Sequence, residues 1–578
     1  MADLVLGPVL RYVGADDATV WVETDAPCTV EVLGNREHTF TVEGHHYALV
    51  CVEGLAPGEA HPYDVRLDGR RAWPLPDDDF PAPVIRTPPP EGQPFRVTFG
   101  SCRVSLPHHP PYTLRKDAHP DGREFDALFT LAHELLRRPR ESWPDLLLML
   151  GDQVYVDEGS PAVRERIRAT RDVTQPPGEQ VANFEEYTWL YHESWGDPTI
   201  RWLLSTIPTA MVLDDHDMAD DWNISRRWKE EMDQKAWWRE RLLGGLMTYW
   251  IYQHIGNLAP RELEHHQEYE EVRRADDGAA ALREFVDWVD SNGEGKVWSF
   301  KRDLGRSRLV VVDDRTARRL EEGQRSIFDQ HEWSWIEDAV RGDFDHLLFA
   351  TTDPILVAPG LHYAEAWNEA VCDGAWGELA AAVGEKLRRA LDFDHWAAFH
   401  VSFERFERLV REVGSGERAR PPASIVALSG DVHHAYLAEV AFRPDDQVQS
   451  AVYQAVCSPF RNALNSHERQ LIRLALSRPG VALTRRLARA ARARDPHIRW
   501  RFVEGPFFDN QVATIELAGR RASLKLEKTV GEPDSDRRNL ETVFERLLVQ
   551  NSSPPGRRLG PTWVRRPREV EGPAPRPA

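Results

Sequence analysis

Four short motifs combine residue types that can bind metal ions or act on a substrate. They are Gly100-Ser101-Cys102-Arg103, Gly151-Asp152-Gln153-Val154-Tyr155, Asp214-Asp215-His216-Asp217 and Gly430-Asp431-Val432-His433-His434. Each motif directly follows an apolar run that is typical of a β-strand. Because ligands gather outside the carboxyl ends of strands in open α/β sheets, we expect the motifs to meet at one edge. The sequence therefore predicts a site that combines a thiolate, a phenolate, carboxylates and imidazole.

The residue types in these motifs indicate a centre with more than one metal ion. A thiolate and a phenolate suit a Lewis-acidic transition ion, and additional carboxylates suit either that ion or a hard cation such as Ca²⁺. Asp152 and Tyr155, three residues apart, can reach one ion from a single turn. Asp431 and His433 project to the same side of an extended segment. Because a free phenol has a pKa of about 10, binding of Tyr155 as a phenolate favours Fe³⁺ over Mg²⁺.

In this order along the chain, the four motifs resemble those of the PhoD-like phosphatases and phosphodiesterases of the calcineurin-like metallophosphoesterase superfamily. The resemblance covers most of the chain and implies an αββα core, in which two β-sheets lie between helices. It also implies a centre with Fe³⁺ and Ca²⁺, in which Cys102 and Tyr155 bind iron and Asp152 bridges to a further ion. In a reducing cytoplasm, Fe²⁺, Zn²⁺ or Mn²⁺ are the alternatives.

The same resemblance adds three metal ligands, and the charge of the site suggests two further residues. Asp215 stands where the superfamily usually has the asparagine of an Asn-His pair, and Asp431 and His433 stand at the two histidines of Gly-His-x-His, so all three are predicted metal ligands. His216 is expected to hydrogen-bond a phosphoryl oxygen or to protonate the leaving group, because imidazole has an ordinary pKa of about 6.5. Arg103 is expected either to pair with a phosphate oxygen or to be a surface arginine after a strand.

These expectations describe a metal-dependent phosphoric ester hydrolase of the alkaline phosphatase or phosphodiesterase type, acting on a phosphate mono- or diester. A metal-bound oxo or hydroxo nucleophile would attack phosphorus in line. The alternative is a non-catalytic metal-binding interaction protein that keeps the phosphatase fold. Covalent catalysis by Ser101 is a lesser alternative. A cysteine phosphatase would need an arginine six residues after Cys102, where the chain has His108, so we discard that class.

The elements that must position these motifs follow an α/β pattern. Apolar runs that end in glycine or acidic residues alternate with long helical stretches, which predicts a mixed or parallel sheet covered by helices. The five runs that matter most cover residues 95–99, 146–150, 211–213, 309–312 and 425–428.

We divide the chain into four parts. Residues 1–72 have short alternating runs, typical of a small fibronectin-like β-sandwich, and residues 73–94 form a proline-rich linker. Residues 95–550 form the PhoD-like catalytic domain, with a Trp-rich helical insertion at about 222–271 that either covers the core or forms a lid. Residues 551–578 contain seven prolines and are predicted to be a disordered tail.

The charge of the chain limits its partners. The formal net charge of −21 over 578 residues opposes general nucleic-acid binding and contact with anionic membranes. The arginine-rich residues 469–501 are the local exception, and a basic amphipathic helix is predicted over 481–494. This segment is either a solvated face or a patch that contacts an anionic surface.

The remaining sequence features indicate a cytoplasmic protein without a transmembrane segment. No apolar run approaches the roughly 18 residues that a spanning helix needs, and the start Met1-Ala2-Asp3-Leu4 lacks the basic region of an export signal. The five cysteines are scattered and form no close pair, which argues against a disulfide framework and against structural zinc.

Overall fold

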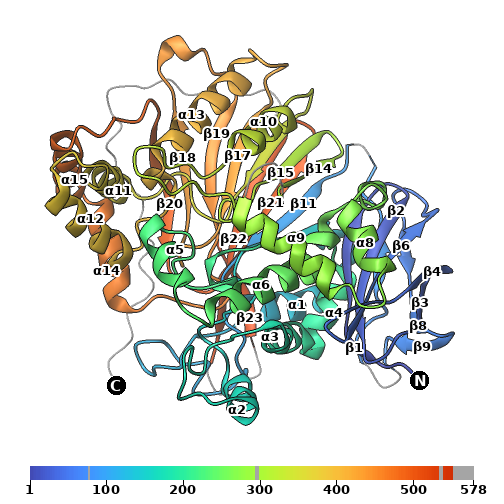
Figure 1. Ribbon diagram of the computed structural model, residues 1–578. Helices are drawn as coiled ribbons and strands as arrows, with labels where there is room; N and C mark the ends of the chain where they lie inside the picture. The colour runs from blue at the N-terminus through green and yellow to red at the C-terminus, as the bar shows by residue number, and fades with distance from the viewer. Residues whose placement is uncertain (76–78, 91, 293–297, 533–537, 551–578) are drawn as a thin grey trace, which may run out of the picture.

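The computed structural model describes residues 1–75, 79–90, 92–292, 298–532 and 538–550 (Figure 1). The predicted disordered tail, residues 551–578, lies outside the described residues. No helix within the described residues is long and apolar enough to cross a membrane.

The N-terminal region forms a small β-sandwich of two four-stranded sheets (Figure 1). Their apolar faces share one core, in which Val20 and Val50 of one sheet meet Val30 and Val65 of the other. The strand orders are β1-β2-β6-β5 and β4-β3-β8-β9. The strands are β1 (Leu4–Val13), β2 (Asp17–Thr24), β3 (Thr29–Val32), β4 (Asn35–His38), β5 (Phe40–Val42), β6 (His45–Glu53), β8 (Val65–Leu67) and β9 (Arg70–Trp73).

Part of the predicted linker, residues 73–94, is attached to this sandwich. Within it, β10 (Val84–Arg86) pairs antiparallel with β7 (Ala60–Pro62). Val84 and Ile85 are buried. The linker therefore contains one ordered strand, although its prolines keep that strand short.

A six-stranded sheet has the order β13-β12-β11-β21-β22-β23. Its first three strands are mutually parallel, and the C-terminal strands run antiparallel. All five residues of β12 are buried, which explains its uninterrupted apolar sequence. The strands are β11 (Phe95–Gly100), β12 (Leu146–Leu150), β13 (Thr209–Val212), β21 (Gln511–Ala518), β22 (Arg521–Gly531) and β23 (Arg538–Val549).

A seven-stranded sheet has the order β14-β15-β16-β17-β19-β18-β20. β15, β16, β17 and β19 are mutually parallel in the middle of this sheet. The strands are β14 (Phe300–Leu304), β15 (Ser307–Val311), β16 (His346–Ala350), β17 (Ser424–Ser429), β18 (Ala435–Ala441), β19 (Ala451–Val456) and β20 (Arg499–Phe507).

The two large sheets face each other across a shared apolar core. Leu148 of β12 belongs to the same buried cluster as Leu348 of β16 and Val426 of β17. On the outer face of the seven-stranded sheet, Phe349 packs with residues of α10 (Gln330–Ala339) and α13 (His400–Ser415). The outer face of the six-stranded sheet is covered by α1 (Ala127–Arg137), α3 (Phe184–Gly196), α4 (Pro198–Thr206) and α6 (Trp238–Thr248). The structure thus has a helix, sheet, sheet, helix order of layers.

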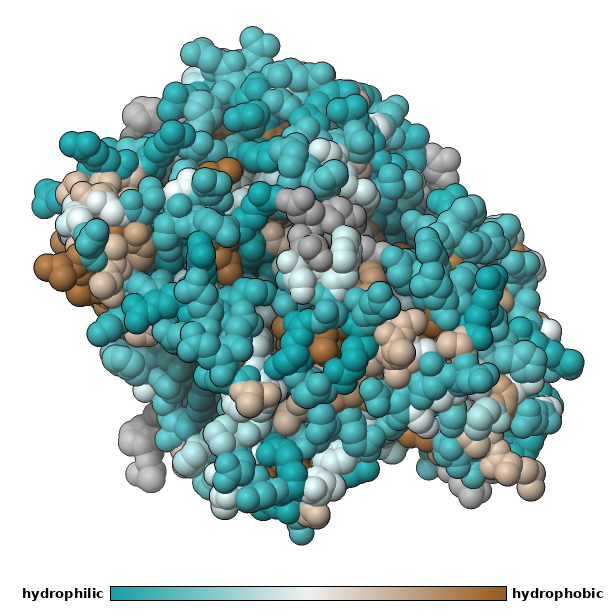
Figure 2. Space-filling model, in the orientation of Figure 1, coloured by the Kyte–Doolittle hydropathy of each residue, from teal (hydrophilic) through white to brown (hydrophobic). Residues whose placement is uncertain are grey.

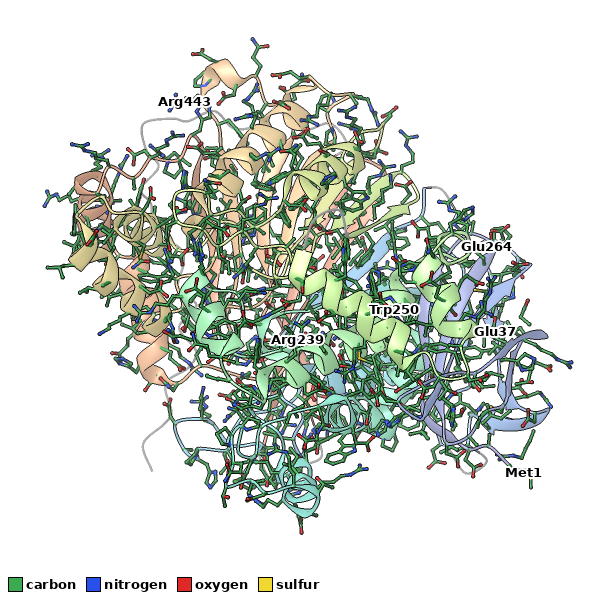
Figure 3. All side chains as sticks on the ribbon, viewed as in Figure 1. Met1, Glu37, Arg239, Trp250, Glu264 and Arg443 are labelled. Atoms are coloured by element: carbon green, nitrogen blue, oxygen red, sulfur yellow. The ribbon has the colours of Figure 1, made fainter. Side chains whose placement is uncertain are left out.

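The Trp-rich segment predicted at about residues 222–271 is helical, and helices continue to Asn292. Trp222, Trp238 and Trp250 are buried in the core that also covers the six-stranded sheet. Figure 3 shows Trp250 between these helices and the N-terminal strands. The helices are α5 (Arg226–Asp233), α6, the π-helical η3 (Tyr249–His254), η4 (Ile255–Asn257), α7 (Pro260–Leu263), α8 (Gln267–Arg274) and α9 (Ala279–Asn292).

The N-terminal sandwich is fixed to this helical layer by buried polar contacts. Arg11 donates from Nη1 to the carbonyl of Tyr252 at 2.9 Å and from Nη2 to Oδ1 of Asn257 at 3.2 Å. Glu23 accepts a hydrogen bond from the hydroxyl of Tyr252 at 2.9 Å and lies 2.9 Å from Nε2 of His192. Because these groups are buried and paired, the sandwich and the helices form one packed unit.

Candidate metal centre

The ends of four strands bring the predicted site residues together. Cys102, Asp152 and Asp215 follow β11, β12 and β13, which are neighbours and run parallel, so their carboxyl ends lie at the same edge. Asp431 follows β17, in the middle of the other sheet. The facing sheets therefore deliver their strand-end motifs to one place, as the sequence predicts.

Two glycines allow this close approach. A Cβ atom on Gly151, which has a φ of +91°, would lie 2.4 Å from Cβ of Asp214. A Cβ atom on Gly430 would lie 2.2 Å from Oγ of Ser101. Only a residue without a side chain fits between the strand ends at these two positions.

The backbone of the predicted ligands adopts an unusual conformation. Cys102, Asp152, Asp431 and His433 have φ values of +57°, +54°, +61° and +50°. This left-handed region costs a residue with a side chain on the order of 1 kcal/mol or more, and such residues cluster at functional sites. The surrounding fold therefore holds four of the predicted ligands in a conformation that their own preferences oppose.

A first group of potential ligands consists of Cys102, Asp152 and His433. One donor atom from each of these side chains lies within 4.8 Å of the other two. The hydroxyl of Tyr155 donates to Oδ2 of Asp152 at 2.9 Å. The thiol of Cys102 is fully buried and lies 3.1 Å from Oγ of Ser101, whose hydroxyl is also buried and so is poorly placed to attack a substrate.

A second group of potential ligands consists of Asp152, Asp215 and His216, again with donor atoms within 4.8 Å of one another. Asp152 thus belongs to both groups, as a carboxylate that bridges two ions would. Its Oδ1 atom is buried and has no hydrogen-bond partner in the described part of the chain. A buried carboxylate oxygen without a donor is a favourable position for a cation.

The electrostatics of the first group also fit a cation. Burial, together with Asp152 and Asp431, raises the pKa of the Cys102 thiol well above its ordinary value. Burial, together with Asp152, raises the pKa of Tyr155 in the same way. Burial lowers the pKa of His433 to about 3, so its imidazole is neutral and available as a ligand. Buried acidic groups without a counter-charge favour a multivalent ion among them.

The structure shows a buried arginine that the sequence analysis did not include. Arg315 lies between three carboxylates and donates from Nε to Asp214, from Nη1 to Asp394 and from Nη2 to Asp353. Its Nη2 is also 3.7 Å from Oδ1 of Asp431. Asp214, Asp353 and Asp431 form a third group of carboxylates whose oxygens lie within 4.8 Å of one another, but Arg315 already supplies its positive charge. The sequence could have indicated this residue, since Arg315 follows the apolar run of β15.

A histidine that does not follow a strand also contacts the centre, and a glutamate supports it. His395 lies after α12 (Glu378–Ala390), and its Nε2 is 3.6 Å from Oδ2 of Asp431. Its Nδ1 is 2.7 Å from Oε1 of Glu365, which lies on α11 (Pro359–Cys372) and is fully buried. Glu365 therefore fixes the ring of His395 against a predicted metal ligand.

His216 is oriented by a carboxylate that the sequence did not predict. Its Nδ1 is 3.2 Å from Oδ1 of Asp157, and its ring lies 4.5 Å from that of Tyr155. Burial lowers the pKa of His216, but Asp157 and Asp215 outweigh this effect and raise it well above its ordinary value. Asp157 therefore orients the ring through Nδ1, and Nε2 lies 3.8 Å from Oδ1 of Asp220.

Arg103 fits neither of the two roles that the sequence suggested, a phosphate ligand or a surface arginine. It is 3 % exposed, donates from Nε to Asp126 at 2.8 Å, and donates from Nη1 to the carbonyl of Ser194 at 2.6 Å. Asp126 also caps α1 by accepting from the backbone of Leu128 and Phe129. Arg103 is therefore a buried structural partner of a helix cap, neither a surface arginine nor a free phosphate ligand.

The layers and the strand-end groups together define an α/β protein with a candidate metal centre at one edge of two facing sheets. The family model described as PhoD-like phosphatase matches residues 124–508, more than half of the chain, and the chain therefore belongs to the PhoD-like phosphatase family. This result confirms the resemblance seen in the motifs. Residues 1–85 match a second model, described as a domain of unknown function (DUF7800).

A solved structure supports the same fold. The chain is similar to one described as "Structure of PhoD", with a TM-score of 0.56 and 12 % sequence identity over 96 % of this chain and 94 % of that chain. At this identity the likeness concerns the fold alone. A maltogenic amylase from S. marinus has a TM-score of 0.17 and 8 % identity, too low to indicate a shared fold. The comparison with curated proteins gives no match.

Proposed function

We propose that this protein is a metal-dependent phosphoric ester hydrolase of the alkaline phosphatase or phosphodiesterase type, acting on phosphate mono- or diesters. The observation that carries the proposal is the position of Asp152 in both ligand groups, beside Cys102 and His433 on one side and Asp215 on the other. Two ions that share a carboxylate can hold both the attacking and the leaving oxygen of a phosphoryl transfer. Membership of the PhoD-like phosphatase family supports this class of reaction.

The donor set supports two different kinds of ion. Cys102, Tyr155, His433 and Asp152 would hold a transition ion, for which we propose Fe³⁺, with Fe²⁺, Zn²⁺ or Mn²⁺ as alternatives. Asp152 and Asp215 would hold a hard cation, for which we propose Ca²⁺. When bound, the ions supply positive charge for the phosphate oxygens and lower the pKa of water.

The protein's own residues then complete the site. Asp157 orients the ring of His216, and we propose that Nε2 of His216 donates a hydrogen bond to the phosphoryl oxygen or a proton to the leaving group. His395 and Arg315 keep the side chain of Asp431 in place from two sides. The nearly complete burial of Cys102 and Asp152 keeps bulk water from competing for these contacts.

The proposed function is accompanied by a proposal about the fold. We propose that the two facing sheets and their helical layers are the αββα sandwich of the metallophosphoesterases. The N-terminal sandwich is then a fibronectin-like module that packs on this core. The alternative function, a metal-binding interaction protein without catalysis, predicts the same ligand groups but no turnover.

The test combines metal analysis with turnover of water-soluble aryl phosphomonoesters and phosphodiesters. The Cys102→Ala and Asp152→Asn variants should keep the fold and lose metal, with turnover reduced by at least about 100-fold. Cys372→Ala is the matched control, because Cys372 lies on α11, outside both ligand groups, and should behave like the parent protein.

Two outcomes would contradict the proposal. Full metal occupancy without hydrolysis of either ester would favour the non-catalytic alternative. Unchanged turnover in both Cys102→Ala and Asp152→Asn would show that the reaction does not use this centre.

A further inference from the structure

A cluster of four helices lies beside the seven-stranded sheet. α12, α14 (Ser466–Leu476) and α15 (Arg478–Ala490) all pack on α11. Trp376, just before α12, donates from Nε1 to the carbonyl of Ala490 at the end of α15 at 3.3 Å. Figure 1 shows these helices together at the left edge of the molecule. We call α11, α12, α14 and α15 the edge cluster.

The edge cluster exposes an unusual amount of apolar surface. Of thirteen large apolar side chains that are exposed within the described residues, seven belong to it or adjoin it. Leu379 and Val383 on α12 are 88 % and 57 % exposed, and Leu483 on α15 is 60 % exposed. The others are Trp376, Leu391, Leu471 and Leu474. Figure 2 shows a group of brown residues at the left edge, where Figure 1 places α12 and α14.

Cations accompany this apolar surface. Residues 466–494 contain eight arginines and one glutamate, in a chain whose net charge is −21. Some of these arginines are paired, since Arg485 and Arg489 share Asp495. Arg486 on α15 and Lys386 on α12 are exposed, and neither has an acidic partner among the residues that the structure describes. The edge cluster therefore combines exposed apolar side chains with exposed cations.

We propose that the edge cluster is a docking surface for an anionic lipid bilayer. A helical surface with exposed leucines next to arginines binds the bilayer interface through apolar burial and through attraction to anionic head groups. A nucleic acid is a poorer fit, because interfaces with nucleic acids are polar and would leave Leu379 and Val383 without apolar contacts. The acidic remainder of the protein repels an anionic surface, so contact is confined to the cluster.

The docking surface adjoins the candidate metal centre along the chain. α12 ends at Ala390, five residues before His395. α14 begins at Ser466, four residues after Asn462, whose side chain lies 3.5 Å from the hydroxyl of Tyr155. The docking proposal does not depend on the proposed reaction.

Co-sedimentation of the full chain with vesicles tests this proposal. We expect the protein to sediment with vesicles of phosphatidylcholine mixed with phosphatidylglycerol, not with phosphatidylcholine alone, and to be released by high salt. Reversing two charges in Lys386→Glu with Arg486→Glu should lower the partition coefficient by at least about tenfold. Replacing Leu379→Ser with Val383→Ser should lower it by a similar factor.

Matched controls lie on the N-terminal region. Arg71 and Leu75 are exposed there, so Arg71→Glu and Leu75→Ser should bind vesicles like the parent protein. Turnover of a water-soluble ester should be unchanged in every variant, which separates docking from the reaction itself. The proposal would be overturned if the protein did not bind vesicles or bound them without anionic lipid. It would also be overturned if the edge-cluster variants bound as well as the parent protein. A dimer that Leu379→Ser dissociates would also overturn it and assign the surface to a second copy of the chain.

Discussion

Glu365 and Glu369 illustrate how two equivalent residues on one helix serve different parts of the molecule. They are four residues apart on α11, and each binds a histidine ring nitrogen, that of His395 at 2.7 Å and that of His400 at 2.9 Å. Only the first pair reaches Asp431. Substitutions in the two pairs can therefore separate the effect of losing a carboxylate on the candidate centre from its effect on α11.

The Glu365→Gln variant should weaken metal binding with little change in fold. Without the carboxylate, the ring of His395 loses its fixed orientation, and the loss of such a supporting contact typically costs 10-fold to 100-fold in metal affinity. Metal retained after dialysis against graded chelator, together with kcat and KM measured separately, gives the answer. Glu369→Gln is the control. Equal metal retention in both variants would remove His395 from the support of the centre.

The residue scale also shows which site residues a sequence can reveal. The sequence places Cys102, Asp152 and His433 in one candidate site because each belongs to a motif that follows an apolar run, where position along the chain determines position in the fold. His395 was not predictable, because it lies in a loop after a helix. Arg103 was predicted wrongly, since its partner Asp126 is 23 residues away and only tertiary packing turns the guanidinium inward.

At the scale of elements, the tight crossing of strand ends depends on Gly151. The Gly151→Ala variant would combine a left-handed backbone with a Cβ atom 2.4 Å from Asp214, a residue that Arg315 holds in place. We expect a loss of about 3 kcal/mol in the free energy of unfolding, together with loss of turnover.

Denaturant unfolding of this variant and of Gly305→Ala separates the cost of the left-handed backbone from the cost of the contact with Asp214. Gly305 also has a left-handed φ of +61°, but nothing lies within 4 Å of its added Cβ atom, so about 1 kcal/mol is expected there. Equal losses in both variants would mean that the contact with Asp214 does not matter.

The elements themselves were largely predictable. The apolar runs at residues 95–99, 146–150 and 425–428 are β11, β12 and β17, because central parallel strands are buried on both faces and so have uninterrupted apolar sequences. The division into two facing sheets was implied by the family resemblance, not by the runs, since period and composition do not specify which strands pair. Strand β10 inside the predicted linker was missed, because a short edge strand among prolines has no distinctive pattern.

At the scale of the whole molecule, we expect the junction between the N-terminal sandwich and the helical layer to be sensitive to pH. His45 lies between two carboxylates, with Nδ1 3.0 Å from Glu23 and Nε2 2.8 Å from Glu185, and His192 contacts Glu23 as well. Burial lowers the pKa of His45, but the two carboxylates outweigh this and raise it above its ordinary value.

The raised pKa of His45 in the folded state determines whether stability rises or falls with pH. The stability that protonated His45 contributes is fully present below about pH 6.5 and is lost as the pH rises through its folded-state pKa. The difference in Tm between the parent protein and His45→Gln should therefore shrink between about pH 5.5 and pH 8.5. His38→Gln on the same sandwich, where the ring lies 3.1 Å from the Thr29 hydroxyl, should show no such trend. A difference that is constant with pH would contradict this account.

The distance along the chain between the parts of the centre has a consequence for synthesis. The hydroxyl of Ser458 donates to the sulfur of Cys102 across 356 residues. At roughly 5–20 residues per second, a ribosome needs about 20 to 70 seconds to extend the nascent chain over that interval. During this time the thiol of Cys102 emerges without its cover, and the first ligand group is complete only after translation has passed His433. The candidate centre is thus assembled late in the synthesis of the chain.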